Sequence, residues 1–147
     1  MPARSYWERT PKQSIELECA RRGRARLVSG CVALLRGQEV DDELVIALGG
    51  PGARTILDSG PKPVYLYWLR VWAARGLLHA YADQAEAAVL EALADEHWRV
   101  REMAAKVTAK HRIGAALEAV AELRDDPVPR VRAAAHRAVV LLTATGS

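Results

Sequence analysis

No stretch of the sequence approaches the ~20 consecutive apolar residues that a membrane-spanning helix requires. The first residues, 1–7, also lack the apolar stretch of a secretory signal peptide. These two absences predict a cytoplasmic protein that has no membrane partner. With 147 residues, half of them apolar and 27% charged, the chain has the composition of an ordinary globular protein. We therefore expect a single domain, 1–147, with a substantial buried core.

Cysteine is scarce as well, with only Cys19 and Cys31 present. They form no Cys-x-x-Cys motif and stand in a segment with helical character. In a cytoplasmic protein such thiols are more often small buried apolar groups than a disulfide. The sequence therefore predicts two free cysteines.

Recognisable motifs for catalysis, metal or cofactor binding are also missing. The four histidines have no zinc-ligand spacing, and no serine or cysteine stands in a nucleophile motif. The glycine-rich segment 49–54 lacks the lysine of a phosphate-binding loop and is typical of a helix-breaking linker. The acidic run 41–43 indicates a helix start rather than a pair of catalytic carboxylates. We expect no enzyme activity, no metal and no cofactor.

The net charge of +3 is too small to indicate nucleic-acid binding by itself, but its distribution is uneven. Residues 1–37 hold eight basic and three acidic groups, whereas residues 38–62 hold two basic and five acidic groups. The excess positive charge therefore lies near the N-terminal end, around Arg21, Arg22, Arg24 and Arg26.

Helix signals dominate the chain, and strand-like alternation is absent, so the fold class is predicted to be all-α. Thr10 and Gln13 form a capping-box pattern for a helix that ends near Gly37, with a break available at Gly23 or at Gly30. Asp41 is expected to cap the following short helix. Asp126, with proline next to it at the first helical position, is expected to cap the last helix.

A repeat with a period of 31 runs through the second half of the chain. The segments 69–75, 100–106 and 131–137 are similar and place Arg70, Arg101 and Arg132 at equal spacing. Asp95 and Asp126 have the same spacing, while the first unit has Val64 at the matching position. Similarity at a fixed period of this kind predicts stacked helical pairs.

The pattern Leu-x-Asp followed by Val-Arg-x-x-Ala-Ala resembles the short HEAT-like repeats of the type first associated with phycobilin lyases. Leu93, Asp95, Val100, Arg101 and Ala104 carry this resemblance, and the unit that contains Asp126 repeats it. The resemblance implies a short right-handed α-solenoid of about three helical pairs, over residues 51–147, with 1–50 as an N-terminal helical cap. It also implies an adaptor rather than bilin chemistry, with an accessory or lyase-type subunit as an alternative.

The positions within the repeat are expected to have different roles. Val100, Met103, Ala104 and Val107 form an apolar stripe toward the partner helix. The opposite face carries Trp98, Glu102 and Ala105. The ladder Arg70, Arg101 and Arg132 is expected to bind the repeated aspartates. The remaining cations and two tryptophans are the candidate partner-binding residues, in rows on the concave face: Trp68, Arg75, Trp98, Arg99, Lys106, Arg130 and Arg137.

These features favour a non-catalytic scaffold that binds a protein partner, an acidic one by charge, through its concave face. The alternative is a nucleic-acid-binding protein similar to the HEAT-like alkylpurine DNA glycosylases, although the chain is short for that family. The sequence leaves the oligomeric state open. A dimer through the C-terminal helix, by way of Ala133 and Val140, is one alternative.

Overall fold

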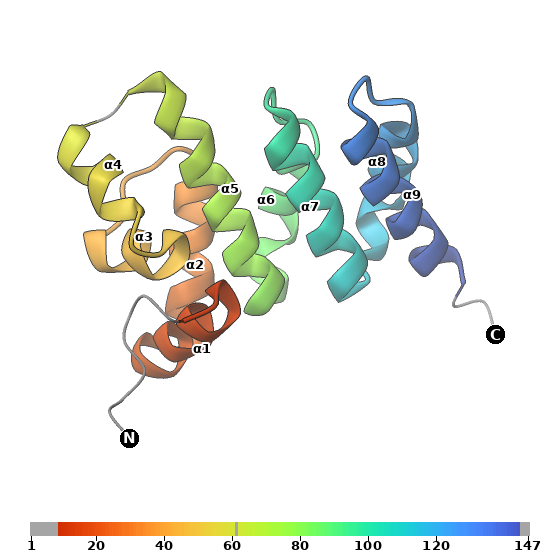
Figure 1. Cartoon of the computed structure of the whole chain (residues 1–147). Coiled ribbons are helices and arrows are strands. Elements are labelled where there is room, and N and C mark those ends of the chain that lie inside the picture. The colour runs from red at the N-terminus through yellow and green to blue at the C-terminus, as the bar shows by residue number, and fades with distance from the viewer. Residues whose placement is uncertain (1–8, 61, 145–147) are drawn as a thin grey trace.

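The computed structural model describes residues 9–60 and 62–144, and in these ranges the chain is helical and contains no strand. Three long helices, α5 (Pro63–His79), α7 (Trp98–His111) and α9 (Pro129–Thr143), stand side by side as a front layer (Figure 1). Behind them lie α2 (Arg24–Leu35), α6 (Glu86–Ala92) and α8 (Leu117–Glu122). This arrangement confirms the predicted all-α solenoid.

Short 3-10 turns join the two layers. They are η2 (Asp83–Ala85) before α6, η3 (Gly114–Ala116) before α8, and η4 (Leu123–Asp125) between α8 and α9. Each turn brings the chain back across the stack, so that α6 packs on α7 and α8 packs on α9.

The back-layer partner of α5 is not the short helix that precedes it in sequence. Helix α2 packs along α5, whereas α4 (Ala53–Ser59) contacts mainly α3 (Asp42–Gly49). Helices α3 and α4 lie together at the end of the stack next to α5, and α1 (Pro11–Arg22) packs on α3 (Figure 1). Thus α2 takes the place that α6 and α8 hold in the later pairs, although it lies in the segment 1–50 that we assigned to the cap.

Local signals predicted most helix starts correctly. Thr10 and Gln13 form the predicted capping box, and Asp41 accepts the N–H of Leu44 as a cap of α3. Of the two glycines at which a break was expected, Gly23 separates α1 from α2, and Gly30 lies inside α2. The φ of Gly23, 92°, lies in a region that side chains disfavour.

The predicted start of the last helix was wrong. Helix α9 begins at Pro129, and its N-cap residue is Val128. The Asp126 carboxylate accepts the N–H of Val128 at 2.9 Å from outside the helix. Asp95 holds the N–H of His97 in the same way, so the repeated aspartates fix the turn before each second helix rather than cap it.

Helix α7 is buried on more sides than the apolar stripe indicated. Val100, Ala104 and Val107 are buried as expected. The face predicted to be opposite is buried too, with Ala105 at 0% exposure and Glu102 at 8%. The reason is that α7 lies between α5 and α9, which cover its two flanks while α6 covers its back.

A glycine lets α2 and α3 approach α5 closely. A Cβ at Gly76 would lie 2.7 Å from the Cys31 sulfur and 2.6 Å from a Leu48 methyl group. Cys31 is fully buried, and burial raises the pKa of its thiol to about 12. Both cysteines are free, as predicted.

The repeated arginines and aspartates form a ladder between neighbouring pairs. Arg70 donates to both carboxylate oxygens of Asp95, at 2.7 and 3.1 Å. Arg101 donates to both oxygens of Asp126, at 2.8 and 3.2 Å. Arg101 also donates to the backbone carbonyl of Asp95 at 2.8 Å, so one guanidinium fixes its own turn and the next one. The expected contact with an aspartate side chain is confirmed for Arg70 and Arg101, whereas Arg132 donates to the backbone carbonyl of Asp126.

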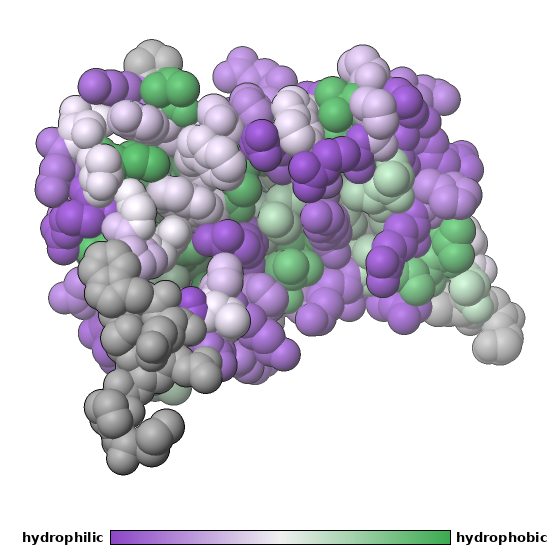
Figure 2. Space-filling model, in the orientation of Figure 1, coloured by the Kyte–Doolittle hydropathy of each residue, from purple (hydrophilic) through white to green (hydrophobic). Residues whose placement is uncertain are grey.

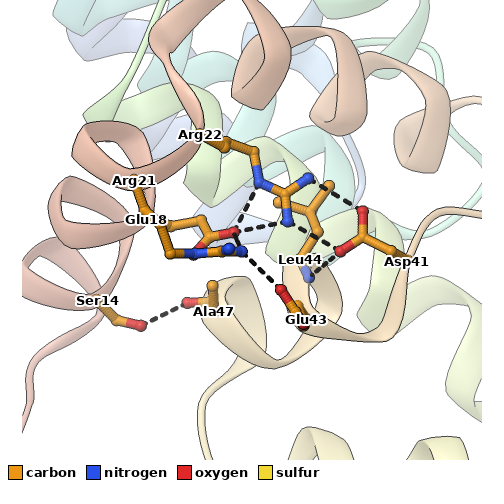
Figure 3. Close-up of polar contacts among 8 residues, drawn as sticks. All are labelled: Ser14, Glu18, Arg21, Arg22, Asp41, Glu43, Leu44 and Ala47. Carbon is orange, nitrogen blue, oxygen red and sulfur yellow. Dashed lines mark hydrogen bonds and ion pairs between the residues drawn. The ribbon is translucent and has the colours of Figure 1, made fainter.

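A second charged network joins α1 to the start of α3 (Figure 3). Glu18 accepts from Arg21 and Arg22 at 2.6 Å each, and these hydrogen bonds, that of Arg21 first, lower the pKa of Glu18. Arg22 reaches on to both oxygens of Asp41, and Arg21 reaches Glu43 at 2.8 Å. Much of the positive charge noted at this end of the chain is therefore paired.

Among the described residues, no helix is long and apolar enough to cross a membrane.

We expect Asp126→Ala to lower the free energy of unfolding by about 3 kcal/mol, because it leaves the half-buried guanidinium of Arg101 without its carboxylate. Chemical denaturation followed by circular dichroism measures this loss. The neighbouring Asp125→Ala, an exposed site, is the control and should change stability by less than about 0.5 kcal/mol. Equal effects of the two changes would contradict the role of the ladder.

We expect the free energy of unfolding of the wild type and of Asp41→Asn to differ by an amount that depends on pH. Asparagine retains the helix cap but not the charge of the aspartate. Hydrogen bonds from Arg22 are the main cause that lowers the pKa of Asp41 to about 2 in the folded protein. The stabilisation by the carboxylate is therefore present above about pH 4, the unfolded value, and is lost as the pH falls toward 2.

Denaturation of both proteins from pH 7 to pH 2 measures this difference. The side chain of Asp41 is 54% exposed, so solvent screening keeps the difference at neutral pH below about 1 kcal/mol. A difference that stayed constant down to pH 2 would show that the charge of Asp41 contributes nothing.

Candidate protein-binding surface

The starts of α5, α7 and α9 lie next to one another, and this alignment brings tryptophans and arginines into a row. The Arg99 guanidinium lies 4.5 Å from the ring centre of Trp98 and 5.1 Å from that of Trp68. Arg130, from α9, lies 5.5 Å from the ring centre of Trp98. We call Trp68, Arg99, Trp98 and Arg130 the Trp–Arg row. Cation–π contacts of this kind stabilise by roughly 0.5–1 kcal/mol each at exposed sites.

The repeat period predicted a row of Trp68, Arg99 and Arg130, which stand at the same position of successive units. The structure brings these three residues together and adds Trp98 between the two arginines. The four side chains come from three consecutive front helices, and all are at least partly exposed. The row is therefore an accessible strip that crosses the stack.

An aromatic pair extends this row, and its contact was not predicted. The rings of Tyr67 and His97 stack at 3.7 Å with an angle of 5° between their planes, and Tyr67 also contacts Trp68. The His97 Nδ1 accepts the N–H of Arg99, and burial, followed by the charge of Arg99, lowers the pKa of His97. A neutral imidazole thus fixes the start of α7. Tyr67 stands one repeat period before Trp98, but this spacing gives no signal for its contact with His97.

A groove of about 610 Å³ lies between α7 and α9, beside the Trp–Arg row. Four cations and one carboxylate line it together with apolar side chains: Leu78, Glu102, Lys106, Ala109, Lys110, Arg130, Ala133, Ala134, Arg137 and Leu141. Figure 2 shows apolar patches over these front helices with hydrophilic residues around them. The groove thus combines an apolar floor with a mostly basic rim.

Glu102 is the acidic group in this groove. It accepts from Arg130 at 3.0 Å, and the Lys106 ammonium lies 3.7 Å from the same oxygen. The equivalent positions in the other units are Val71 and Ala133, so the stacking of repeats does not require a carboxylate here. Glu102 ties Arg130 and Lys106 into the groove, and the mostly basic character of the rim remains.

Of the expected row Arg75, Lys106 and Arg137, the structure places two residues at the groove and one elsewhere. Lys106 and Arg137 are exposed and line the groove. Arg75 is partly buried and donates to the Leu48 carbonyl at 2.6 Å, near the end of α3. Burial lowers its pKa, and its charge faces the negative end of the α3 dipole. Arg75 therefore joins the cap to the first pair.

No group of three or more histidine, cysteine, aspartate or glutamate side chains that could hold a metal ion occurs in the described part of the chain.

Stacked helical pairs, joined by a repeated arginine–aspartate ladder, define an α-solenoid. The model of the family described as HEAT repeats matches residues 66–139, and the chain belongs to this family. No curated protein and no solved structure matches the chain.

Proposed function

We propose that the protein is a non-catalytic scaffold that binds a protein partner through its front layer, centred on the Trp–Arg row. HEAT repeats in general mediate protein interactions, and the family therefore supports this role. The observation that carries the proposal is the row itself. Trp68 and Trp98 do not recur at equivalent positions in the units, so stacking does not demand them.

The chemistry of the row suits a binding site for protein. Tryptophan and arginine are among the residues most enriched at interaction hot spots. The contacts of Arg99 with Trp68 and Trp98 hold all three side chains in place before binding, which reduces the entropy that a complex must lose. The basic rim of the adjacent groove favours a partner whose surface is acidic.

Nucleic-acid binding is the second candidate, because a basic surface with tryptophan can stack on bases. In this structure, however, Arg99 already contacts the rings of both Trp68 and Trp98. A base would have to displace the guanidinium to reach those two ring faces. This observation favours a protein ligand.

Substitution within the row tests the proposal. We expect Trp98→Ala and Arg99→Ala to weaken binding of a partner held by the wild-type protein by about thirtyfold, the effect of a hot-spot residue. Affinity capture from cell extract with quantitative mass spectrometry identifies the partner, and titration with the purified partner measures the loss. The matched control is Arg124→Ala, in η4, where the side chain donates to a carbonyl of its own turn.

If both row variants retained every partner of the wild type, the surface would be the wrong one. Titration of a fluorescent DNA duplex at low salt separates the second candidate, because phosphate contacts are strongest there. Tight binding to the duplex, lost steeply as salt rises, would replace the protein-binding proposal with the nucleic-acid one.

A further inference from the structure

The groove between α7 and α9 carries positive charge at helical spacing on both of its walls. Lys106 and Lys110 stand about one turn apart on α7, and Arg130 and Arg137 stand about two turns apart on α9. All four side chains are exposed. The groove is also lined by small and medium apolar side chains: Leu78, Ala109, Ala133, Ala134 and Leu141.

Two of the four cations have no carboxylate of the chain to neutralise them. Glu102 serves Arg130 at 3.0 Å and Lys106 at 3.7 Å. No carboxylate of residues 9–60 and 62–144 lies within ion-pair distance of Lys110 or Arg137. The positive charge along the groove is therefore only partly balanced, and carboxylates of a ligand can meet the remainder.

The walls of the groove offer side chains to a ligand rather than backbone groups. Along its middle, the N–H and C=O groups of α7 and α9 bond within each helix. An extended segment laid in the groove would lose water from its own backbone groups without gaining partners for them. A helix satisfies these groups internally, so a helix is the favoured ligand.

We propose that the groove binds an acidic amphipathic helix of a partner protein. This inference rests on the proposed function and names the part of the partner that the scaffold recognises. The apolar stripe of the bound helix covers the apolar lining, and carboxylates on its two flanks face the cations of α7 and of α9. Because Arg130 also contacts Trp98, the bound helix reaches the Trp–Arg row at one end.

A second copy of the chain is a poorer ligand for this groove. Helices α3, α6 and α8 carry carboxylates and no cation, but they turn Leu44, Val89 and Val120 into the chain's own core. Helix α1 exposes Leu17, but it holds three cations against two carboxylates. The acidic helices of the chain thus lack a free apolar stripe, and the helix with an exposed leucine has the wrong charge.

Two fluorescent peptides of identical composition are the probes. Each has about 18 residues of leucine, alanine and glutamate, which is enough for a short helix in water. The first places leucine and alanine on one stripe with glutamate on both sides, and the second spreads the same residues evenly around the helix. Fluorescence anisotropy at low salt measures their binding to the full chain. We expect the first peptide to bind at least about tenfold more tightly, because only it covers the apolar lining and meets both walls at once.

Reversal of the two cations that lack a carboxylate tests the walls. Lys110→Glu combined with Arg137→Glu should weaken binding of the first peptide by about thirtyfold. The matched control is Arg24→Glu combined with Arg54→Glu, which makes the same change of net charge at exposed positions of α2 and α4. Because these residues do not line the groove, the control should change the affinity by less than about threefold.

A charge swap separates recognition from a loss of folding. A third peptide, with lysine in place of each glutamate, should bind the Lys110→Glu, Arg137→Glu variant more tightly than it binds the wild type. A damaged structure would not gain this affinity. A fourth peptide, with proline at the centre of the first sequence, should lose binding, because proline breaks a helix but suits an extended chain.

Three results would overturn the inference. Equal binding of the first two peptides would leave only a general attraction of charge, and undiminished binding of the proline peptide would indicate an extended ligand. Self-association of the wild-type chain in sedimentation, abolished by Lys110→Glu with Arg137→Glu, would assign the groove to a second copy.

The partner captured in the test of the proposed function separates the two proposals. If Trp98→Ala loses that partner while Lys110→Glu with Arg137→Glu retains it, the scaffold role holds and the groove is not the site of recognition. If all of these variants retain the partner, the proposed function itself is wrong. Loss of the partner in both kinds of variant, but not in the Arg24→Glu, Arg54→Glu control, would support both.

Discussion

The bond between each repeat arginine and the aspartate of the next pair sets the geometry on which the rest of the structure depends. Arg101 holds the backbone of its own turn and the carboxylate of the next turn at once. This double attachment fixes the starts of the front helices at one level. Only at that common level can Trp98 of one helix lie within reach of Arg130 on the next.

Small side chains at the helix contacts are the second requirement for this geometry. Ala104, Ala105 and Gly76 let helices approach on several sides, so that α7 has little free surface other than its front. The tryptophans and arginines of the Trp–Arg row accordingly lie on the front layer, near the helix starts. The residues of the row differ from unit to unit, whereas some buried positions repeat, such as that of Ala73, Ala104 and Ala135.

The repeat period was enough to predict the stack, its ladder and the row from Trp68 to Arg130, because each depends on spacing within similar units. Pairing between distant segments could not be predicted in the same way. Nothing local in residues 24–35 indicates that α2 replaces α4 behind α5. The burial of Arg75 depends on the same packing of the N-terminal segment against α5. The end of α3 contacts Arg75 only after this segment has folded back onto α5.

The error at Asp126 has a different physical origin. An aspartate before a proline is a good local signal for a helix cap, but its two oxygens here serve Arg101 and the N–H of Val128. A tertiary contact thus decided what the side chain does, and the helix starts later. The stack of Tyr67 on His97 likewise joins two units and has no signature within either one.

The close packing of α2 on Gly76 has a consequence for the chemistry of Cys31. Its thiol is enclosed between helices that are distant in sequence, and burial keeps it in the unreactive protonated form. An alkylating reagent can reach it only when α2 moves away from α5. The rate at which Cys31 is modified therefore reports how often the back layer opens at this end of the solenoid, without any introduced probe.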